Sequence, residues 1–286
     1  MTTLALGKMP IATLFLERET DKLGLNPQAI DPIHRAFRPM TEETALDVSE
    51  LAIVTAIQAI DQGRDIVPLP LTIAARIQHG CILQNSQFTA ITPKQLEGRS
   101  VAVRAYSQTT GAWVRAILET EYGVDCRKIT WVTQDPPHVA SAPEPANVVR
   151  DAGGASPLAL LRAGTVIAAV FGNDMPSEPW AATVIPDADT AGVASLAKSK
   201  IVQINHVAAV SRDFFHRHPA KVKDIFAGFA AARQNLPKAQ QAMLPAGRQE
   251  MQPSVEILLK SVYRQGLTDH NLSFDDVFGE ALTLLG

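Results

Sequence analysis

The sequence predicts an α/β protein of two lobes, in which the second lobe is inserted into the first. Short apolar strands alternate with amphipathic helices along the chain, an order that is typical of a wound α/β sheet. Polar stretches interrupt this alternation near Asn85 and again near Ser199. We therefore expect a discontinuous first lobe of residues 1–87 and 200–286, and an inserted second lobe of residues 88–199.

The composition is that of a globular chain with no sign of a macromolecular partner. Its 286 residues are 46% hydrophobic, which is enough for a sizeable core. The net charge of -3 gives no basic surplus for a phosphate backbone, and there is no run of about 18 apolar residues to cross a membrane. We therefore expect neither a nucleic acid nor a membrane as partner.

Neither a metal nor an organic cofactor is predicted. Cys81 and Cys126 are the only cysteines, too few for a disulfide framework or a Cys-based zinc site. His216 and His218 have no Cys or acidic partner at ligand spacing, so we interpret them as surface residues. The sequence also lacks a glycine-rich phosphate motif and a nucleophile elbow.

Residues 1–17 predict a first strand that runs into a loop on the ligand side. Gly7, Lys8 and Pro10 break this stretch, which lacks the long apolar segment of a secretory signal. A cytoplasmic location is therefore expected, unless a leader has been removed from the chain.

The next clear element is a helix that ends at Gly63. Its apolar residues recur at helical spacing, namely Leu51, Val54, Ile57 and Ile60. Ser49 is the candidate N-cap of this helix. Residues 65–71 and 80–84 then predict short buried strands, joined by a loop that carries Arg76, Gln78 and His79.

Residues 99–123 predict a strand, a tight polar turn and a helix. Helical spacing begins after Ser107, and Gly123 is expected to end the helix in the left-handed conformation. Unpaired N–H groups and hydroxyls at the start of this helix favour an anion. Capping of the helix by Ser107 or Thr109 explains the same residues equally well, and the two roles are compatible.

The remaining elements continue the alternation. Further strands are predicted at residues 128–132, 166–171 and 206–210, and further helices at residues 156–163, 219–235, 255–265 and 275–284. Residues 135–145 hold four prolines and predict an irregular loop that covers part of the molecule, and residues 175–189 also predict a loop.

A set of short motifs occurs in order over most of the chain. They are Asp47 to Leu51 (DVSEL), Pro70 through His79 to Asn85, Leu96 to Val124 with VAVRAY inside it, Ile129 and Trp131, Asn205-His206, and Gln265 to Thr268 (QGLT). In this order they resemble the 4,5-dihydroxyphthalate decarboxylase family of the type II periplasmic-binding-protein fold. The resemblance implies a ligand held in an interlobe cleft. It also implies cofactor-independent decarboxylation of a hydroxylated aromatic dicarboxylate such as 4,5-dihydroxyphthalate.

Such a reaction needs a proton donor and cationic groups that hold carboxylates. Histidine is a suitable acid near neutral pH, and arginine binds carboxylates through two parallel hydrogen bonds. We expect His79 and His206 to be the donors, with a slight preference for His79 because Arg76 and Gln78 give it a polar neighbourhood. Either histidine can instead be a hydrogen-bonded structural residue.

The side chains expected to hold the substrate are polar or charged and lie near predicted strand ends or the central turn. They are Ser49, Glu50, Arg76, Tyr106, Ser107, Thr109, Thr110 and Arg115. Arg115 has an equally good alternative, an ion pair with Glu119 one helical turn further on. Trp113 is interpreted as a core residue rather than a wall for an aromatic ring.

Two other functions are compatible with the sequence. One is a solute-binding protein or sensor for a small aromatic carboxylate, because a fold by itself does not determine function. The other is a different lyase on the same fold, similar to chorismate dehydratase. The expected partner is a small-molecule aromatic carboxylate, and a homo-oligomer is compatible with the sequence.

Overall fold

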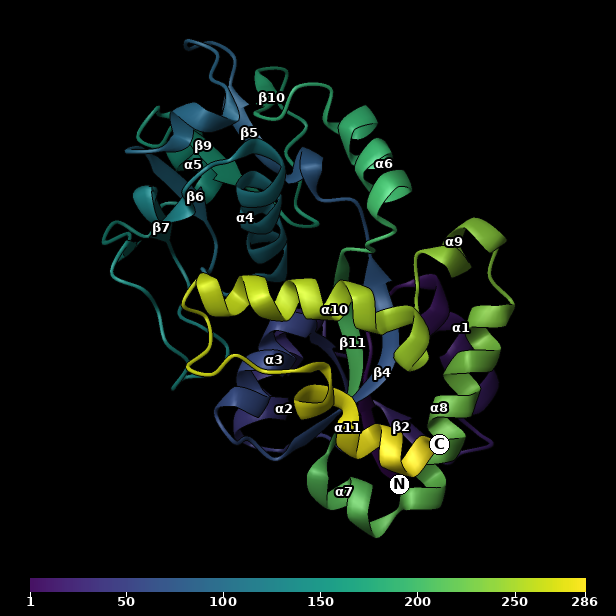
Figure 1. Cartoon of the computed structure of the whole chain (residues 1–286). Helices are drawn as coiled ribbons and strands as arrows, with labels where there is room; N and C mark the ends of the chain where they lie inside the picture. The colour runs from purple at the N-terminus through teal and green to yellow at the C-terminus, as the bar shows by residue number, and fades with distance from the viewer.

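The computed structural model describes residues 1–286 and contains two β-sheets (Figure 1). The first sheet has the strand order β2-β1-β3-β11-β4. Its strands are β1 (Thr2–Ala5), β2 (Leu25–Pro27), β3 (Val48–Ala52), β4 (Ile66–Ala75) and β11 (Ile204–Ser211). Strand β1 is parallel to β2 and β3, whereas β11 is antiparallel to both β3 and β4.

The second sheet has the order β10-β5-β9-β6-β7-β8. Its strands are β5 (Ile82–Asn85), β6 (Ser100–Val103), β7 (Thr130–Thr133), β8 (Val148–Arg150), β9 (Ala168–Val170) and β10 (Ala181–Thr183). Strands β9, β6, β7 and β8 are parallel, and β5 is antiparallel to β9 and β10.

Helices cover both sheets (Figure 1). They are α1 (Pro10–Glu19), α2 (Phe37–Glu42), α3 (Ile53–Asp61), α4 (Thr109–Tyr122), α5 (Pro157–Arg162), α6 (Ala188–Ser199), α7 (Arg212–Arg217), α8 (Pro219–Gln234), α9 (Lys238–Ala242), α10 (Gly247–Arg264) and α11 (Phe274–Leu285). Single 3-10 turns occur at Ile33–Ala36, His79–Cys81, Pro93–Leu96 and Cys126–Lys128. None of the helices combines the length and apolar composition needed to cross a lipid bilayer.

The two-lobed α/β architecture with an inserted second lobe is confirmed. The chain leaves the first sheet after β4, builds the whole second sheet, and returns to the first sheet at β11. The expected boundary after residue 87 needs a correction, because strand Ile82–Asn85 pairs with β9 and β10 in the second sheet. The first crossing between the lobes therefore lies before residue 82.

One buried core joins the two lobes. A cluster of 49 buried residues includes Ile57 of α3, Trp113 of α4 and Leu258 of α10, together with residues of both sheets. Helix α10 lies across the molecule between the two lobes (Figure 1). A second cluster of 21 residues packs α1 and α8 against the other face of the first sheet, where Phe15 and Phe229 stack with ring centroids 3.8 Å apart.

Several predicted elements differ from the structure. The loop expected after the first strand is helix α1, which begins at Pro10 and buries Ile11 and Phe15. Ser49 is not an N-cap, because it lies inside the fully buried strand β3 and the helix begins only at Ile53. Helix α6 was missed because it buries little beyond Ala188 and Gly192, and so shows a weak apolar pattern.

The central unit matches its prediction closely. Strand β6 is followed by a short turn and by helix α4, which ends at Gly123 with φ of 63°. This left-handed conformation is the reason why glycine suits the position. The predicted final helices are also present, although α10 begins eight residues earlier than expected, at Gly247 rather than Val255.

Candidate functional site

A cleft of about 650 Å³ lies between the lobes. It is lined by residues at the ends of strands: Gly7 to Met9 follow β1, Arg76 follows β4, Arg104 follows β6, and Gly172 to Asp174 follow β9. The start of β11 contributes Asn205 and His206, since this strand runs in the opposite direction. Ligands of open α/β sheets bind outside the carboxyl ends of the strands, and the cleft has this position.

The structure brings six of the predicted site residues to this cleft. They are Glu50, Arg76, Ser107, Thr109, Thr110 and His206. Four predicted residues lie elsewhere, namely Ser49, His79, Tyr106 and Arg115.

His206 and Glu50 form a pair on adjacent strands. Nδ1 of His206 lies 2.5 Å from Oε1 of Glu50, and the Glu50 side chain is 1% exposed. The second carboxylate oxygen of Glu50 accepts the N–H of Gly7 at 2.7 Å. Because a carboxylate oxygen only accepts hydrogen bonds, Oε1 of Glu50 directs the Nδ1 proton of His206 toward itself and leaves Nε2 free for a ligand. A T-shaped contact with Phe37 fixes the imidazole plane.

Arg76 forms a cationic corner with the start of helix α4. Its Nη2 donates to the Thr110 hydroxyl at 3.0 Å, and its Nη1 donates to the carbonyl of Gly172 at 3.0 Å and to Asn173 Oδ1 at 3.1 Å. No carboxylate neutralises this guanidinium. The corner is therefore suited to an anionic group, which the N-terminus of α4 also favours.

Two further features complete the corner. The Ser107 hydroxyl is buried and has no hydrogen-bond partner, so it is free to donate to a ligand. Gly172 passes so close to the helix start that a Cβ there would lie 2.7 Å from Nε2 of Gln108. A larger residue at this position would therefore displace the Gln108 amide, beside the Gly172 carbonyl that Arg76 contacts.

Thr109 has a different role from the one predicted. Although it lines the cleft, its hydroxyl accepts the N–H of Val54, at the start of α3, at 3.3 Å. This hydrogen bond joins the two lobes. The side chain of Thr109 therefore holds the helix start in place, and the backbone N–H groups beside it remain available to an anion.

The sequence reasoning missed four basic side chains of the cleft, His34, Arg104, His138 and the exposed Lys8, which pairs with Asp31 at 2.7 Å. Nδ1 of His138 lies 3.0 Å from the Thr55 hydroxyl, and burial, with a smaller effect of Arg104, lowers the pKa of His138 to about 4. Burial also lowers the pKa of His34, again with Arg104 as the next cause. Both imidazoles are therefore neutral at pH 7 and offer hydrogen bonds rather than charge.

A signal for two of these residues was present in the sequence. Arg104 directly follows the predicted strand, where side chains meet at the sheet edge. His138 lies in the proline-rich loop at residues 135–145, which was expected to cover part of the molecule and which carries His138 onto the cleft.

His79 does not fit the predicted role of proton donor. Its side chain is fully buried, and Nε2 pairs with Glu121 of α4 at 3.0 Å. The other oxygen of Glu121 accepts from Ser195 of α6 at 2.8 Å. The 3-10 turn at His79–Cys81 directs the ring under α6, so close that a Cβ on Gly192 would lie 3.1 Å from Nδ1. His79 is therefore a structural histidine.

Arg115 and Tyr106 are likewise structural. The Arg115 guanidinium is fully buried and donates to Gln265 Oε1 and to the Tyr106 carbonyl, both at 2.7 Å. The guanidinium carbon lies 3.9 Å from the centroid of the Tyr106 ring, and the Tyr106 hydroxyl donates to the Gln265 carbonyl at 3.0 Å. Neither residue lines the cleft, and Glu119 pairs with Arg264 rather than with Arg115.

Ser49 also points away from the cleft. Its side chain is fully buried, and its hydroxyl donates to the carbonyl of Glu50 at 2.9 Å. Because side chains alternate along a strand, placing Glu50 toward the cleft turns Ser49 to the opposite face.

The two crossings between the lobes lie side by side and are joined by hydrogen bonds. The N–H of Gln78 donates to Gln203 Oε1 at 2.6 Å, and the Gln78 side chain donates to Asn205 Oδ1 at 2.8 Å. Asn205 lines the cleft next to His206. The crossings thus position the site as well as connecting the lobes.

The described side chains include no group of three or more His, Cys, Asp or Glu that could hold a metal ion. Cys81 and Cys126 are both free and buried. Burial raises the pKa of both thiols, so they are packing residues rather than nucleophiles.

No protein-family model matches the chain. A sequence comparison finds 4,5-dihydroxyphthalate decarboxylase of Comamonas testosteroni, which is 25% identical over 198 residues. The matched region is 65% of this chain and 58% of that relative.

Solved structures share the fold at low sequence identity. The alkanesulfonate-binding protein SsuA from Xanthomonas axonopodis pv. citri, bound to MOPS, has a TM-score of 0.59 and 13% identity, with 98% of this chain and 96% of that chain covered. A conserved Candida albicans gene product with the generic periplasmic binding protein fold has a TM-score of 0.56 and 12% identity, covering 99% and 94% of the two chains. The chain therefore has the periplasmic-binding-protein fold, and over 65% of its length it is similar in sequence to a 4,5-dihydroxyphthalate decarboxylase.

Proposed function

We propose that this protein is a cofactor-independent decarboxylase of a hydroxylated aromatic dicarboxylate, of which 4,5-dihydroxyphthalate is the example. The observation that carries the proposal is that one cleft holds both a carboxylate-supported histidine, His206, and an unneutralised arginine, Arg76. The similarity to the Comamonas testosteroni enzyme supports the choice of reaction.

The cationic corner holds one carboxylate of the substrate. Arg76 supplies a planar guanidinium that no protein carboxylate occupies, and the buried Ser107 hydroxyl supplies a further donor. Arg104 contributes a second positive charge, although it also pairs with Asp135 at 3.3 Å. Two cationic groups in one cleft suit a dicarboxylate better than a monocarboxylate.

His206 supplies the proton for the reaction. Protonated at Nε2, its imidazolium is stabilised by the Glu50 carboxylate, and it transfers the Nε2 proton to the ring carbon that bears the leaving carboxylate. The hydroxyl para to that carbon stabilises the resulting cyclic dienone-like cation. The bond from ring to carboxylate then breaks, its electron pair restores the aromatic ring, and carbon dioxide leaves.

The balance of the step requires no oxidant or reductant. One proton is added and one carbon dioxide is lost, and 4,5-dihydroxyphthalate would give 3,4-dihydroxybenzoate. The proton returns to Nε2 of His206 from solvent before the next turnover. Neutral His138 and His34 are suited to hydrogen bonds with the ring hydroxyls.

The test is to incubate the pure protein with a panel of hydroxylated phthalates and benzoates while carbon dioxide release is measured. We expect carbon dioxide release from a substrate that has two carboxylates and a hydroxyl para to one of them. The analogue that lacks this hydroxyl should release none. Binding of the same compounds is measured in parallel by calorimetry. Tight binding of every compound without carbon dioxide release would contradict the proposal and indicate a solute-binding protein or sensor.

A further inference from the structure

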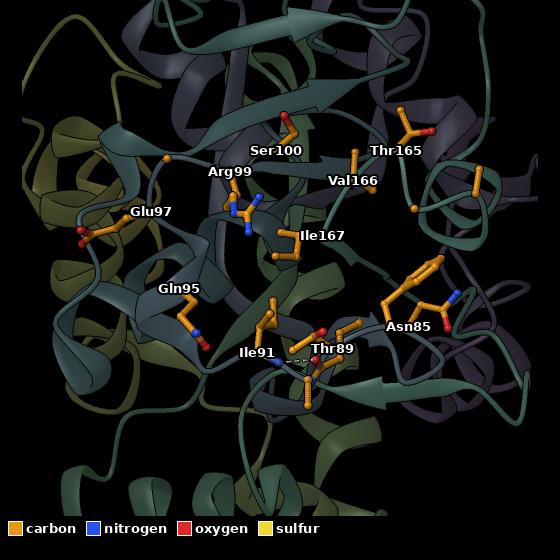
Figure 2. Close-up of a pocket in the computed structure, with 16 residues that line it drawn as sticks. Asn85, Thr89, Ile91, Gln95, Glu97, Arg99, Ser100, Thr165, Val166 and Ile167 are labelled. Atoms are coloured by element: carbon orange, nitrogen blue, oxygen red, sulfur yellow. Dashed lines mark hydrogen bonds between the residues drawn. The ribbon is translucent and has the colours of Figure 1, made fainter.

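A second cavity, of about 900 Å³, lies at the other end of the six-stranded sheet (Figure 2). It forms between the segment of residues 84–100 and the segment of residues 163–167. The cleft takes residues that follow β6 and β9, whereas this cavity takes Ser100 and Ile167 at the start of the same strands. The two cavities share no lining residue.

Arg99 gives this cavity an unneutralised positive charge. Its backbone is fixed, because the N–H donates to the Leu96 carbonyl at 3.1 Å and the carbonyl accepts from Thr130 at 2.9 Å. Its guanidinium takes part in no ion pair or hydrogen bond, and it points toward Ile167 (Figure 2).

The acidic neighbour of Arg99 is engaged elsewhere. Glu97 points away from Arg99 (Figure 2), and its carboxylate accepts the N–H of Asp125 and the Lys94 ammonium, both at 2.7 Å. These bonds, with the Asp125 N–H as the largest cause, lower the pKa of Glu97. The charge of Glu97 is therefore compensated without Arg99.

Asn85 adds a buried donor without an acceptor. The residue is 4% exposed, and its Oδ1 accepts the N–H of Gln87 at 3.0 Å. A backbone N–H can only donate, so this bond fixes the amide orientation and assigns Nδ2 as the free end. Nδ2 has no partner within the protein, which is rare for a buried amide, and it is closed to solvent. Asn85 is therefore a fixed part of the cavity wall.

Apolar side chains supply the walls of the cavity. Phe88 is 54% exposed, although it is one of the largest apolar residues of the chain. Its ring rests against Gly164, where a Cβ would lie 3.0 Å from the ring. Ile91 is held in place because its N–H donates to Gln84 Oε1 at 2.8 Å, and Ile167 forms the opposite wall.

We propose that this cavity binds a small carboxylate with an apolar, planar body, independently of the cleft. The carboxylate pairs with Arg99 and the body lies between Phe88, Ile91 and Ile167. An unpaired cation and an exposed aromatic wall in one cavity are the complement of such a molecule.

The test measures binding of 4-fluorobenzoate by fluorine NMR. It uses the full chain with Arg76→Gln, which weakens carboxylate binding in the cleft. We expect saturable binding of one equivalent in this background. Adding Arg99→Gln should raise the dissociation constant at least tenfold, whereas adding Arg162→Gln should not change it, because Arg162 is already paired with Glu178. Neutral 4-fluorobenzyl alcohol should bind at least tenfold more weakly than the benzoate.

Three results would overturn the proposal. They are equal affinity with and without Arg99→Gln, equal affinity of the alcohol and the benzoate, and loss of all binding with Arg76→Gln alone. Sedimentation of the unliganded protein tests whether a second copy of the chain, rather than a small molecule, covers the cavity. A dimer that Phe88→Ser dissociates would show that a second copy covers the cavity, which also contradicts a small-molecule site. None of these outcomes depends on whether the cleft releases carbon dioxide.

Discussion

Nδ1 of His206 lies 2.5 Å from the carboxylate of Glu50, which is buried at the centre of the first sheet. The two residues belong to neighbouring antiparallel strands, β11 and β3, so the sheet itself sets their geometry. A histidine held this way presents one defined ring nitrogen to the cleft. Of the three histidines that line the cleft, His206 alone has a carboxylate partner, and this leads to the first two predictions.

The substitution His206→Gln is expected to reduce turnover by about 10² to 10⁴, the usual contribution of general acid catalysis. Ligand affinity should stay within about tenfold of the unmodified protein, because glutamine keeps one hydrogen bond to the ligand. The measurement is carbon dioxide release together with calorimetric binding. His216→Gln is the matched control, since His216 is 62% exposed and pairs with Glu280 on the surface. Full turnover of the His206 variant would assign the proton to another group.

Glu50→Gln should lower turnover more than binding. The substitution keeps the shape of the side chain but replaces a carboxylate oxygen, which only accepts a hydrogen bond from Nδ1 of His206, with an amide whose NH2 group can face that nitrogen instead. Turnover should therefore fall at least tenfold, because the variant no longer fixes which ring nitrogen faces the ligand. The measurement is carbon dioxide release beside calorimetric binding of the same substrate. Unchanged kcat in the variant would remove Glu50 from the proton transfer.

Arg76→Gln is expected to weaken ligand binding by about tenfold to a hundredfold. The substitution removes a charge-assisted pair with the ligand carboxylate and leaves the Thr110 hydroxyl and the start of α4 in place. Arg217→Gln serves as the control, because Arg217 pairs with Asp213 on the surface. Calorimetry with the best substrate of the panel provides the measurement. Equal affinity in both variants would remove Arg76 from the site.

Stability should fall with decreasing pH because of His138. Its pKa is about 4 in the folded protein, below the ordinary value of 6.5. Between these two values the unfolded chain binds a proton that the folded protein does not, so the free energy of unfolding falls as pH falls. The full effect is at most about 3 kcal/mol. The free energy of unfolding, measured with urea between pH 7 and pH 4, should fall less steeply with pH in His138→Gln than in the unmodified protein. Equal pH dependence in the two proteins would show that His138 is not the cause.

Ligand binding is expected to close the lobes around the paired crossings at residues 76–81 and 200–203. Hydrogen bonds from Gln78 to Gln203 and Asn205 make these two segments move together. The core shared by both lobes limits the rotation to a small angle. X-ray scattering with and without a tight ligand should show a small decrease in the radius of gyration. Identical profiles at saturation would argue against closure.

The strand-turn-helix unit and its position at the cleft could be predicted because each part has a local signal. The alternation in β6, the hydroxyl-rich turn and Gly123 all depend on neighbours within a few residues. His206 and Arg76 also had local signals, because His206 begins a predicted strand and Arg76 lies in the predicted loop between two strands.

The errors concern orientation, which depends on contacts distant in sequence. Whether His79 faces the cleft is decided by Glu121 and Gly192, more than 40 residues away. Arg115 is directed inward by Gln265, which lies 150 residues further along the chain. The sequence around His79 and around Arg115 contains no pattern that indicates these distant partners. Local reasoning therefore predicts a ligand contact for each polar side chain.

The pairing of Arg115 with Gln265 also bears on how the protein is made. The inserted lobe is complete in sequence long before α10 is synthesised, yet within that lobe its most deeply buried cation, Arg115, hydrogen-bonds only to the Tyr106 carbonyl until residue 265 arrives. Trp113 similarly waits for the carbonyl of Ile204. In the nascent chain, α4 therefore lacks these two buried hydrogen bonds until the C-terminal segment is made.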